Sequence, residues 1–283
     1  LPTRLVGADH CEYVHTGVVR RELLVGVAGR DLAILKRRSR LLAGSMKVVV
    51  SVGGSVLAPE LDPDRVTAYA DVVNQLVADG CQVAAVVGGG GVARDYISTA
   101  RDLGANEIEL DQIGIDVTRL NARLLISALG ENVVTAPAKD YEAAGEVMRN
   151  GDVVVMGGVS PAQTTDAVSA ALAEYVGADL LVYATSVPGV FSADPAEDDE
   201  AERYEELTAN DLVDVIAGLE MNAGASAPVD LLAAKVIQRS GMRTIVLDGN
   251  DPERVLSAVR YGDHDGTDII PKGTGDELTY WAE

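Results

Sequence analysis

Cysteine, histidine and long apolar runs are all scarce in this chain of 283 residues. The two cysteines, Cys11 and Cys81, provide neither a disulfide framework nor the spacing of a metal site, and we expect Cys81, at the start of a predicted strand, to be a buried thiol. No stretch approaches the roughly eighteen uncharged apolar residues of a membrane-spanning helix. These absences indicate a cytoplasmic protein with no membrane partner.

Positive charge is scarce as well. The formal net charge is −21, and neither nucleic acid nor anionic lipid is expected as the main partner, because both require basic patches. Residues 1–45 carry eight basic and four acidic residues, which leaves −25 for residues 46–283. A surface this acidic stays hydrated and soluble where salt is high and screening is strong, which indicates a salt-loving source. Lysines are few in the acidic part: Lys47, Lys139, Lys235 and Lys272.

The change of charge at Met46 suggests a boundary in the chain. We interpret residues 1–45 as an extension foreign to the fold, either disordered or translated from a misplaced start. A targeting arm is the alternative, although the segment lacks the uninterrupted apolar region of a secretory signal. At the other end, residues 272–283 have no periodicity and are expected to fray.

Glycines follow three predicted strands. Segment 156–168 begins with a glycine pair and opens onto an apolar helix, with Thr164, Thr165 and Asp166 where the N-cap belongs. Glycine lets backbone N–H groups approach phosphate oxygens, and a helix N-terminus adds a favourable dipole. The alternative for each junction alone is a turn that needs glycine for its backbone angles. The other two junctions lie in segments 46–55 and 86–94.

Two common nucleotide-binding motifs are absent. No Gly-x-x-x-x-Gly-Lys-Ser/Thr sequence occurs, and no glycine run has the spacing of the dinucleotide fingerprint followed by a ribose-binding acid. In an open parallel sheet the three glycine junctions would gather at the carboxyl edge of the strands, where ligands bind. The sequence therefore predicts a site for polyanionic ligands on a nucleotide-binding fold of another type.

Predicted strands and helices alternate throughout, which is typical of a mainly parallel sheet covered on both faces. Segment 194–206 is dense in acidic residues and is predicted to be a solvated loop or hairpin. The predicted strands are 46–52, 82–87, 132–135, 152–156, 179–183 and 243–247. The predicted helices are 64–79, 91–103, 114–129, 140–149, 164–176, 208–218, 229–240 and 252–260.

Seven segments in order resemble the archaeal-type uridylate (UMP) kinases of the amino-acid kinase fold. The resemblance covers residues 46–271 and implies an α/β domain, a three-layer αβα sandwich with a central, mainly parallel sheet. Its N-terminal half would bind UMP and its C-terminal half ATP. The matching segments are Ser51–Ser55, Val87–Arg94, Asp111–Arg119, Met156–Val168, Thr185–Pro195, Leu231–Lys235 and Gly262–Gly266.

The resemblance implies transfer of the γ-phosphoryl group from ATP to UMP, with Mg²⁺, in a homohexamer. It assigns ATP contacts to Ser51, Val52, Gly53, Gly54, Ser55, Gly90, Arg94, Thr185, Phe191 and Asp194. It assigns UMP contacts to Gly89, Asp111, Val159, Ser160, Pro161, Ala162, Gln163, Thr164 and Thr165.

The chemistry needs no general base, because a UMP phosphate is largely a dianion near pH 7 and its oxygen is already a nucleophile. Phosphoryl transfer needs in-line positioning and positive charge or N–H donors around the equatorial oxygens. We expect Gly53, Gly54, Arg94 and Lys235 to supply them as catalytic residues. For Lys235, a lysine that extends along the protein surface is the alternative.

The sequence departs from relatives at one position, since many members of the wider fold carry a lysine where Ser51 stands. Phe191, the only phenylalanine, retains stacking on adenine without a phenol hydrogen bond. His264 is interpreted as a turn residue and Asp116 as a helix-start acid.

Two other functions are also compatible with the sequence. One is a kinase of the same fold with a small carboxylate, carbamate or phosphate acceptor. The other is a non-catalytic nucleotide sensor or oxyanion-storage protein, which the missing lysine in the first glycine loop motivates.

Overall fold

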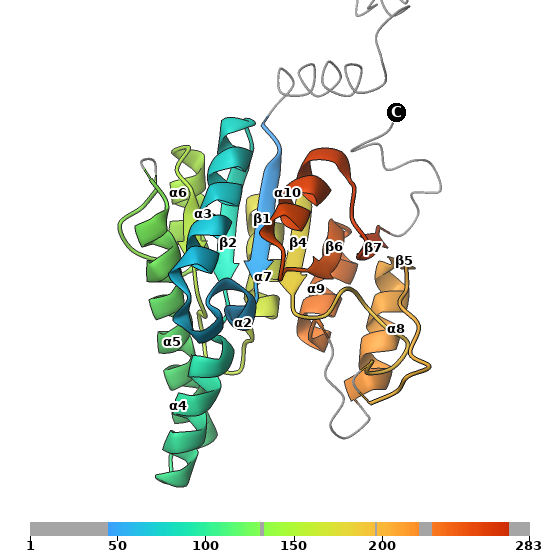
Figure 1. Cartoon of the computed structure of the whole chain (residues 1–283), viewed down its shortest axis with the longest axis horizontal. Coiled ribbons are helices and arrows are strands. Elements are labelled where there is room, and N and C mark those ends of the chain that lie inside the picture. Colours follow the sequence, from blue (N-terminus) through green and yellow to red (C-terminus); the bar gives the residue numbers. More distant parts are fainter. Residues whose placement is uncertain (1–44, 131–132, 196, 221–227, 272–283) are drawn as a thin grey trace, which may run out of the picture.

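The computed structural model describes residues 45–130, 133–195, 197–220 and 228–271 of the chain, which form a central sheet between two layers of helices (Figure 1). Within these residues the sheet has seven strands in the order β3-β2-β1-β4-β6-β7-β5. Neighbouring strands pair in parallel except β6 and β7, which are antiparallel. The strands are β1 (Lys47–Val52), β2 (Gln82–Val87), β3 (Val154–Met156), β4 (Leu180–Thr185), β5 (Glu206–Thr208), β6 (Arg243–Asp248) and β7 (Thr267–Ile270).

Helices cover both faces of the sheet because its strands are apolar on both sides. Val48, Val50 and Val52 of β1 pack with one set of helices, and Val49 packs with the other. The first set comprises α2 (Gly54–Leu57), α3 (Pro63–Ala78), α5 (Glu107–Ala128) and α10 (Pro252–Tyr261). The second comprises α6 (Tyr141–Arg149), α7 (Thr165–Val176), α8 (Ala209–Glu220) and α9 (Leu231–Ser240). The three-layer α/β sandwich expected from the sequence is therefore confirmed.

Helices α4 (Gly90–Asp102) and α5 extend past the carboxyl ends of the strands (Figure 1). The sequence prediction placed the start of α5 at residue 114, and that boundary is wrong. The helix begins at Glu107, because Asn106 and Glu109 form a capping box in which each side chain accepts from the other's backbone N–H. Asp111 therefore lies inside the helix rather than ahead of it. Asp116 also lies inside α5, so its interpretation as a helix-start acid is wrong.

Two further sequence predictions need correction. Segment 132–135 is not a strand in its described part, where Val133 forms only an isolated bridge with Val153. Strands β5 and β7 were missed, because both are short and each carries an acidic residue within its apolar pattern. An antiparallel bridge joins Phe191, which precedes the acidic segment 194–206, to Arg203 within it, in keeping with the hairpin alternative.

The remaining fold-level expectations concern the cysteines, the membrane and the chain ends. Cys81 is buried, as expected. Among the described residues, no helix combines the length and the hydropathy that crossing a bilayer would require. Segments 1–45 and 272–283 fall outside the described residues, apart from residue 45, so that their predicted status stays a prediction.

Candidate nucleotide-binding site

The three glycine junctions lie side by side at the carboxyl edge of the sheet, as the sequence predicts. Strands β1, β2 and β3 are neighbours in parallel register, so that the segments following them emerge at the same edge. We call residues 53–55 the first glycine loop, 88–91 the second and 157–165 the third.

The first two glycine loops are interlocked backbone to backbone. A Cβ atom added to Gly54 would lie 2.2 Å from the backbone nitrogen of Gly90 and 2.4 Å from the carbonyl oxygen of Gly88. Gly90 also adopts a positive φ of 64°, which side chains disfavour. The close contacts of Gly54 with Gly88 and Gly90 leave no room for a side chain at Gly54. The two loops therefore meet through bare backbone at this edge.

Arg94 adds positive charge to these two loops. It lies in the first turns of α4 with its side chain exposed, and one of its terminal nitrogens lies 3.3 Å from the Ser55 hydroxyl. Among the described residues it forms no ion pair, so that its charge is uncompensated beside the first two glycine loops. A phosphate group bound there would meet a guanidinium as well as N–H donors.

The third glycine loop leads into the N-terminus of α7. Thr164 is the N-cap, and its hydroxyl accepts from the Ala167 N–H at 3.1 Å. Ala162 has a φ of 63°, a left-handed conformation unusual for a residue with a side chain, and its N–H donates to the Asp111 carboxylate at 2.8 Å. The loop is therefore shaped by Asp111 of α5, in addition to any contact this carboxylate makes with a ligand.

Val159 to Thr165 form the rest of the third glycine loop, and all are partly or fully exposed. The expected set is thus brought together at one edge: Val159, Ser160, Pro161, Ala162, Gln163, Thr164 and Thr165, with Gly89 on the neighbouring loop.

Asp166 is a residue of this site that the sequence did not single out as functional. Burial, with a smaller contribution from the charge of Asp230, raises the pKa of its carboxyl from 3.8 to about 7. Beneath it the fully buried Tyr183 hydroxyl donates to the Asp166 carbonyl oxygen at 2.8 Å. In the sequence Asp166 looked like any acid at a helix start, and only the fold shows that Asp230, the N-cap of α9, lies nearby.

The expected ATP segment follows β4, the other neighbour of β1. The Gly53 N–H donates to the Ala184 carbonyl at 3.0 Å, which places the first glycine loop beside the end of β4. Thr185 closes a turn there by accepting from the Val187 N–H and donating to the Val187 carbonyl. Further along, Phe191 and Asp194 are partly buried, and the Asp194 carbonyl accepts two backbone bonds from residues 197 and 198.

Two expected ATP residues lie within a strand. Ser51 and Val52 are the last residues of β1, with side chains that are 4% and 2% exposed. The Val52 carbonyl accepts from the Gly88 N–H at 2.9 Å. Their side chains are therefore packed in the sheet, and Gly53, Gly54 and Ser55 are the residues that reach its edge.

Lys235 is not brought to the three glycine loops by any contact in the described residues. Its side chain is exposed on α9, and its ammonium group lies 3.5 Å from the Gln238 side-chain oxygen on the same helix. Its role in catalysis stays a prediction. His264 accepts from the Gly266 N–H at 3.2 Å, as a turn residue would.

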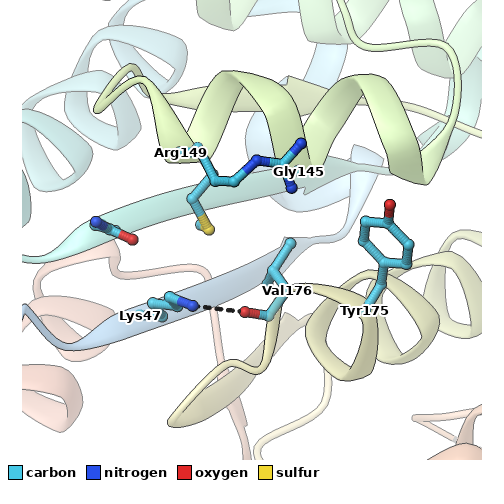
Figure 2. Close-up of a pocket in the computed structure, with 7 residues that line it drawn as sticks. Lys47, Gly145, Arg149, Tyr175 and Val176 are labelled. Atoms are coloured by element: carbon cyan, nitrogen blue, oxygen red, sulfur yellow. Dashed lines mark hydrogen bonds between the residues drawn. The ribbon is translucent and has the colours of Figure 1, made fainter.

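A cavity of about 130 Å³ lies at the opposite edge of the sheet, where β1 and β2 begin (Figure 2). Lys47 in this cavity donates to the Val176 carbonyl at 2.8 Å and so satisfies the C-terminus of α7. Arg149 ends α6 on its other side. The two cations stabilise helix ends, and the cavity is separate from the glycine loops.

Comparisons with a family model, with related sequences and with a solved structure all show similarity to the same family. Residues 46–248 match the model of the amino acid kinase family. The uridylate kinase of Halobacterium salinarum is 71% identical over 238 residues, which covers 84% of this chain and 99% of that protein. The uridylate kinase of Haloquadratum walsbyi is 66% identical, with 84% and 98% covered. The crystal structure of uridylate kinase from Archaeoglobus fulgidus superposes with a TM-score of 0.71 at 45% identity, over 79% of this chain and all of that one.

Proposed function

The chain belongs to the archaeal-type uridylate kinases of the amino acid kinase family, and on that premise we propose that it transfers the γ-phosphoryl group of ATP to UMP, yielding ADP and UDP. The observation that supports this most is the convergence of three glycine loops, Arg94 and the N-terminus of α7 at one edge of the sheet. Such an edge offers donors for two phosphorylated ligands at once.

The two nucleotides would meet across the first two glycine loops. Gly53, Gly54, Ser55 and Gly90 would receive the ATP phosphates, with Thr185, Phe191 and Asp194 around adenine and ribose. The third glycine loop and Gly89 would hold the UMP phosphate, and Asp111 its nucleoside part. Because α4 and α7 both start at this edge, their unpaired N–H groups would face phosphate oxygens.

Catalysis in this arrangement is positioning combined with charge stabilisation. The UMP phosphate oxygen attacks the γ-phosphorus as ADP leaves, and no proton has to be removed first. The Arg94 guanidinium would neutralise charge on the equatorial oxygens, and its hydrogen bond to the Ser55 hydroxyl of the first glycine loop supports this role. Lys235 is a further proposed source of charge.

Mg²⁺ would enter with ATP as part of the substrate. Among the described residues, no group of three or more potential metal-ligating side chains is found. That arrangement fits a magnesium ion held chiefly by phosphate oxygens and water, which is how Mg²⁺ usually binds in kinases.

Four wider properties complete the proposal: cytoplasmic location, a step in pyrimidine nucleotide biosynthesis, adaptation to high salt, and assembly as a homohexamer. The charge of −21 and the halophile relatives support the third. Large exposed apolar side chains support association of copies through α4 and α5: Tyr96 on α4 is 60% exposed, Leu103 at the C-cap of α4 is 84% exposed, and Ile108 on α5 is 59% exposed.

The proposal is tested by coupled ADP release in molar potassium chloride with Mg-ATP and, in parallel, UMP, CMP, acetylglutamate and carbamate as acceptors. We expect turnover with UMP. Turnover with acetylglutamate or carbamate instead would assign a carboxylate or carbamate kinase, and ATP binding without turnover on any acceptor would favour a sensor.

A further inference from the structure

Helix α5 carries two buried polar residues, Thr118 and Asn121, with side chains 7% and 3% exposed. Buried polar groups are costly unless they are hydrogen-bonded, so that their partners indicate what they do. Both side chains point out of the helix onto backbone atoms of the glycine loops, one on each of two different loops.

Thr118 binds the start of the third glycine loop. Its hydroxyl accepts from the Gly158 N–H at 2.7 Å and donates to the Ile115 carbonyl at 2.6 Å, which fixes the direction of the hydroxyl. The next residue, Arg119, donates through Nε to the Gly158 carbonyl at 3.1 Å. Both backbone groups of Gly158 are therefore held by consecutive residues of α5.

Contact between α5 and this loop is also direct. A Cβ atom on Gly157 would lie 2.4 Å from the Thr118 hydroxyl oxygen, and one on Gly158 would lie 2.9 Å from the Ile115 side chain. The third glycine loop therefore cannot move closer to α5 without a steric clash. It cannot move away from α5 without breaking the hydrogen bonds at Gly158.

Asn121 binds the second glycine loop. Its amide nitrogen donates to the Gly88 carbonyl at 2.9 Å and to the Gly89 carbonyl at 3.2 Å. In a trans peptide the N–H points opposite to the carbonyl, so that the N–H groups of Gly89 and Gly90 point away from Asn121. Among the described residues, neither of these N–H groups has a backbone hydrogen-bond partner.

We propose that Thr118 and Asn121 are positioning residues that fix the second and third glycine loops at one spacing and one orientation relative to each other. The inference rests on the proposed function, in which these loops hold the two reacting phosphates. Because α5 is a single rigid helix, displacement of one loop relative to the other requires loss of one of the two sets of bonds. Small misplacements of reacting groups are costly in rate, and this is the physical reason for such a brace.

The test uses Thr118→Val, which removes the hydroxyl at nearly constant shape, and Thr118→Ser, which retains it. Thr99→Val on α4 is the matched control, since the exposed Thr99 hydroxyl donates to the Asp95 carbonyl of its own helix and to no other group among the described residues. Asn121→Asp removes the amide donors at constant shape and places a carboxylate against two carbonyl oxygens. All four variants are compared with the native chain after thermal unfolding shows that they are folded.

We expect Thr118→Val to raise the KM for UMP and to lower kcat, so that kcat/KM for UMP falls by about tenfold in total, with the KM for ATP unchanged, because one lost buried hydrogen bond is worth about that factor. Thr118→Ser and Thr99→Val should match the native chain. Asn121→Asp should lower kcat by at least about tenfold. Equal losses for both nucleotides in Thr118→Val, or native kinetics in a folded Asn121→Asp, would overturn the proposal.

Amide hydrogen exchange separates this inference from the proposed function, because it needs no turnover. We expect faster exchange in residues 157–165 for Thr118→Val and in residues 88–91 for Asn121→Asp, each confined to its own loop. Absence of UMP turnover in the native chain would refute the function alone, whereas unchanged exchange in both variants would refute the brace.

Discussion

At the scale of single residues, Arg94 is exposed beside two glycine loops and has no ion-pair partner within the part of the chain that the structure describes. Arg94→Ala should lower kcat by at least about tenfold while changing the affinity for UMP little, because the charge it meets grows in the transition state. Steady-state kinetics with titration of UMP binding measures both.

Arg101→Ala on the same helix is the matched control for Arg94→Ala, since Arg101 pairs with Glu107 on the surface. It should leave kcat unchanged. If the two variants lose activity equally, Arg94 has no special role in the transition state.

Asp166 gives a prediction about pH. Its pKa is raised from 3.8 to about 7 by burial and then by Asp230, so that the folded protein retains a proton that the unfolded chain releases. The stabilisation is complete below about pH 4 and is lost as the pH rises to about 7. Asp166→Asn should therefore have a higher free energy of unfolding than the native chain at pH 8. At pH 5 the difference between the two free energies should be much smaller.

Chemical unfolding at fixed salt and without magnesium measures this margin, and the exposed Asp116→Asn on α5 is the control. A margin that is the same for Asp166→Asn at both pH values would show that the Asp166 carboxyl is ionised throughout.

Among single residues, the sequence predicted best the location of the glycines whose exposed backbone forms the edge of the sheet. Gly53, Gly54, Gly89 and Gly90 form the expected edge because glycine follows the strands directly. Thr118 could not be found from the sequence, because its proposed role depends on contact with a loop 40 residues away.

At the scale of elements, the interlock of the first two glycine loops predicts a sharp effect of one methyl group. Gly54→Ala should abolish detectable ATP binding and lower the thermal midpoint, because the new atom would lie 2.2 Å from the Gly90 nitrogen. ATP titration and thermal unfolding measure the two effects.

Gly218→Ala is the control for Gly54→Ala, because Gly218 lies within α8 and a Cβ atom there meets nothing within 4 Å. This change should stabilise the protein slightly, since alanine favours helix by up to about 1 kcal/mol over glycine. Intact ATP binding in Gly54→Ala would mean that the loops separate easily.

The order of elements was largely predictable, because strands β1, β2, β4 and β6 are apolar runs with clear ends. The start of α5 was not predicted, because the stretch before residue 114 is rich in acids and lacks an apolar stripe. Its capping box at Asn106 and Glu109 was the signal that could have located it. Strand β7 runs antiparallel to β6, and no local sequence pattern identifies the strand with which such a short strand pairs.

At the scale of the whole molecule, the net charge of −21 should decide how the thermal stability of the protein depends on salt. The thermal midpoint should rise steeply between dilute and molar potassium chloride, since the screening length falls from about 10 Å at 0.1 M to about 3 Å at 1 M. Thermal unfolding across a salt series measures the dependence. Replacing the exposed Glu197, Asp199 and Glu200 with amides should make it shallower. A midpoint indifferent to salt would contradict adaptation to high salt.

In the proposed reaction, one edge of the sheet passes a phosphoryl group from ATP to UMP. The most direct measurement supplies ATP labelled in its γ-phosphorus, with UMP and magnesium in molar potassium chloride, and follows the label by chromatography. We expect label in the β-position of UDP, at the same rate as ADP appears. Label released as inorganic phosphate, or retained in ATP by a chain that binds both nucleotides, would contradict it.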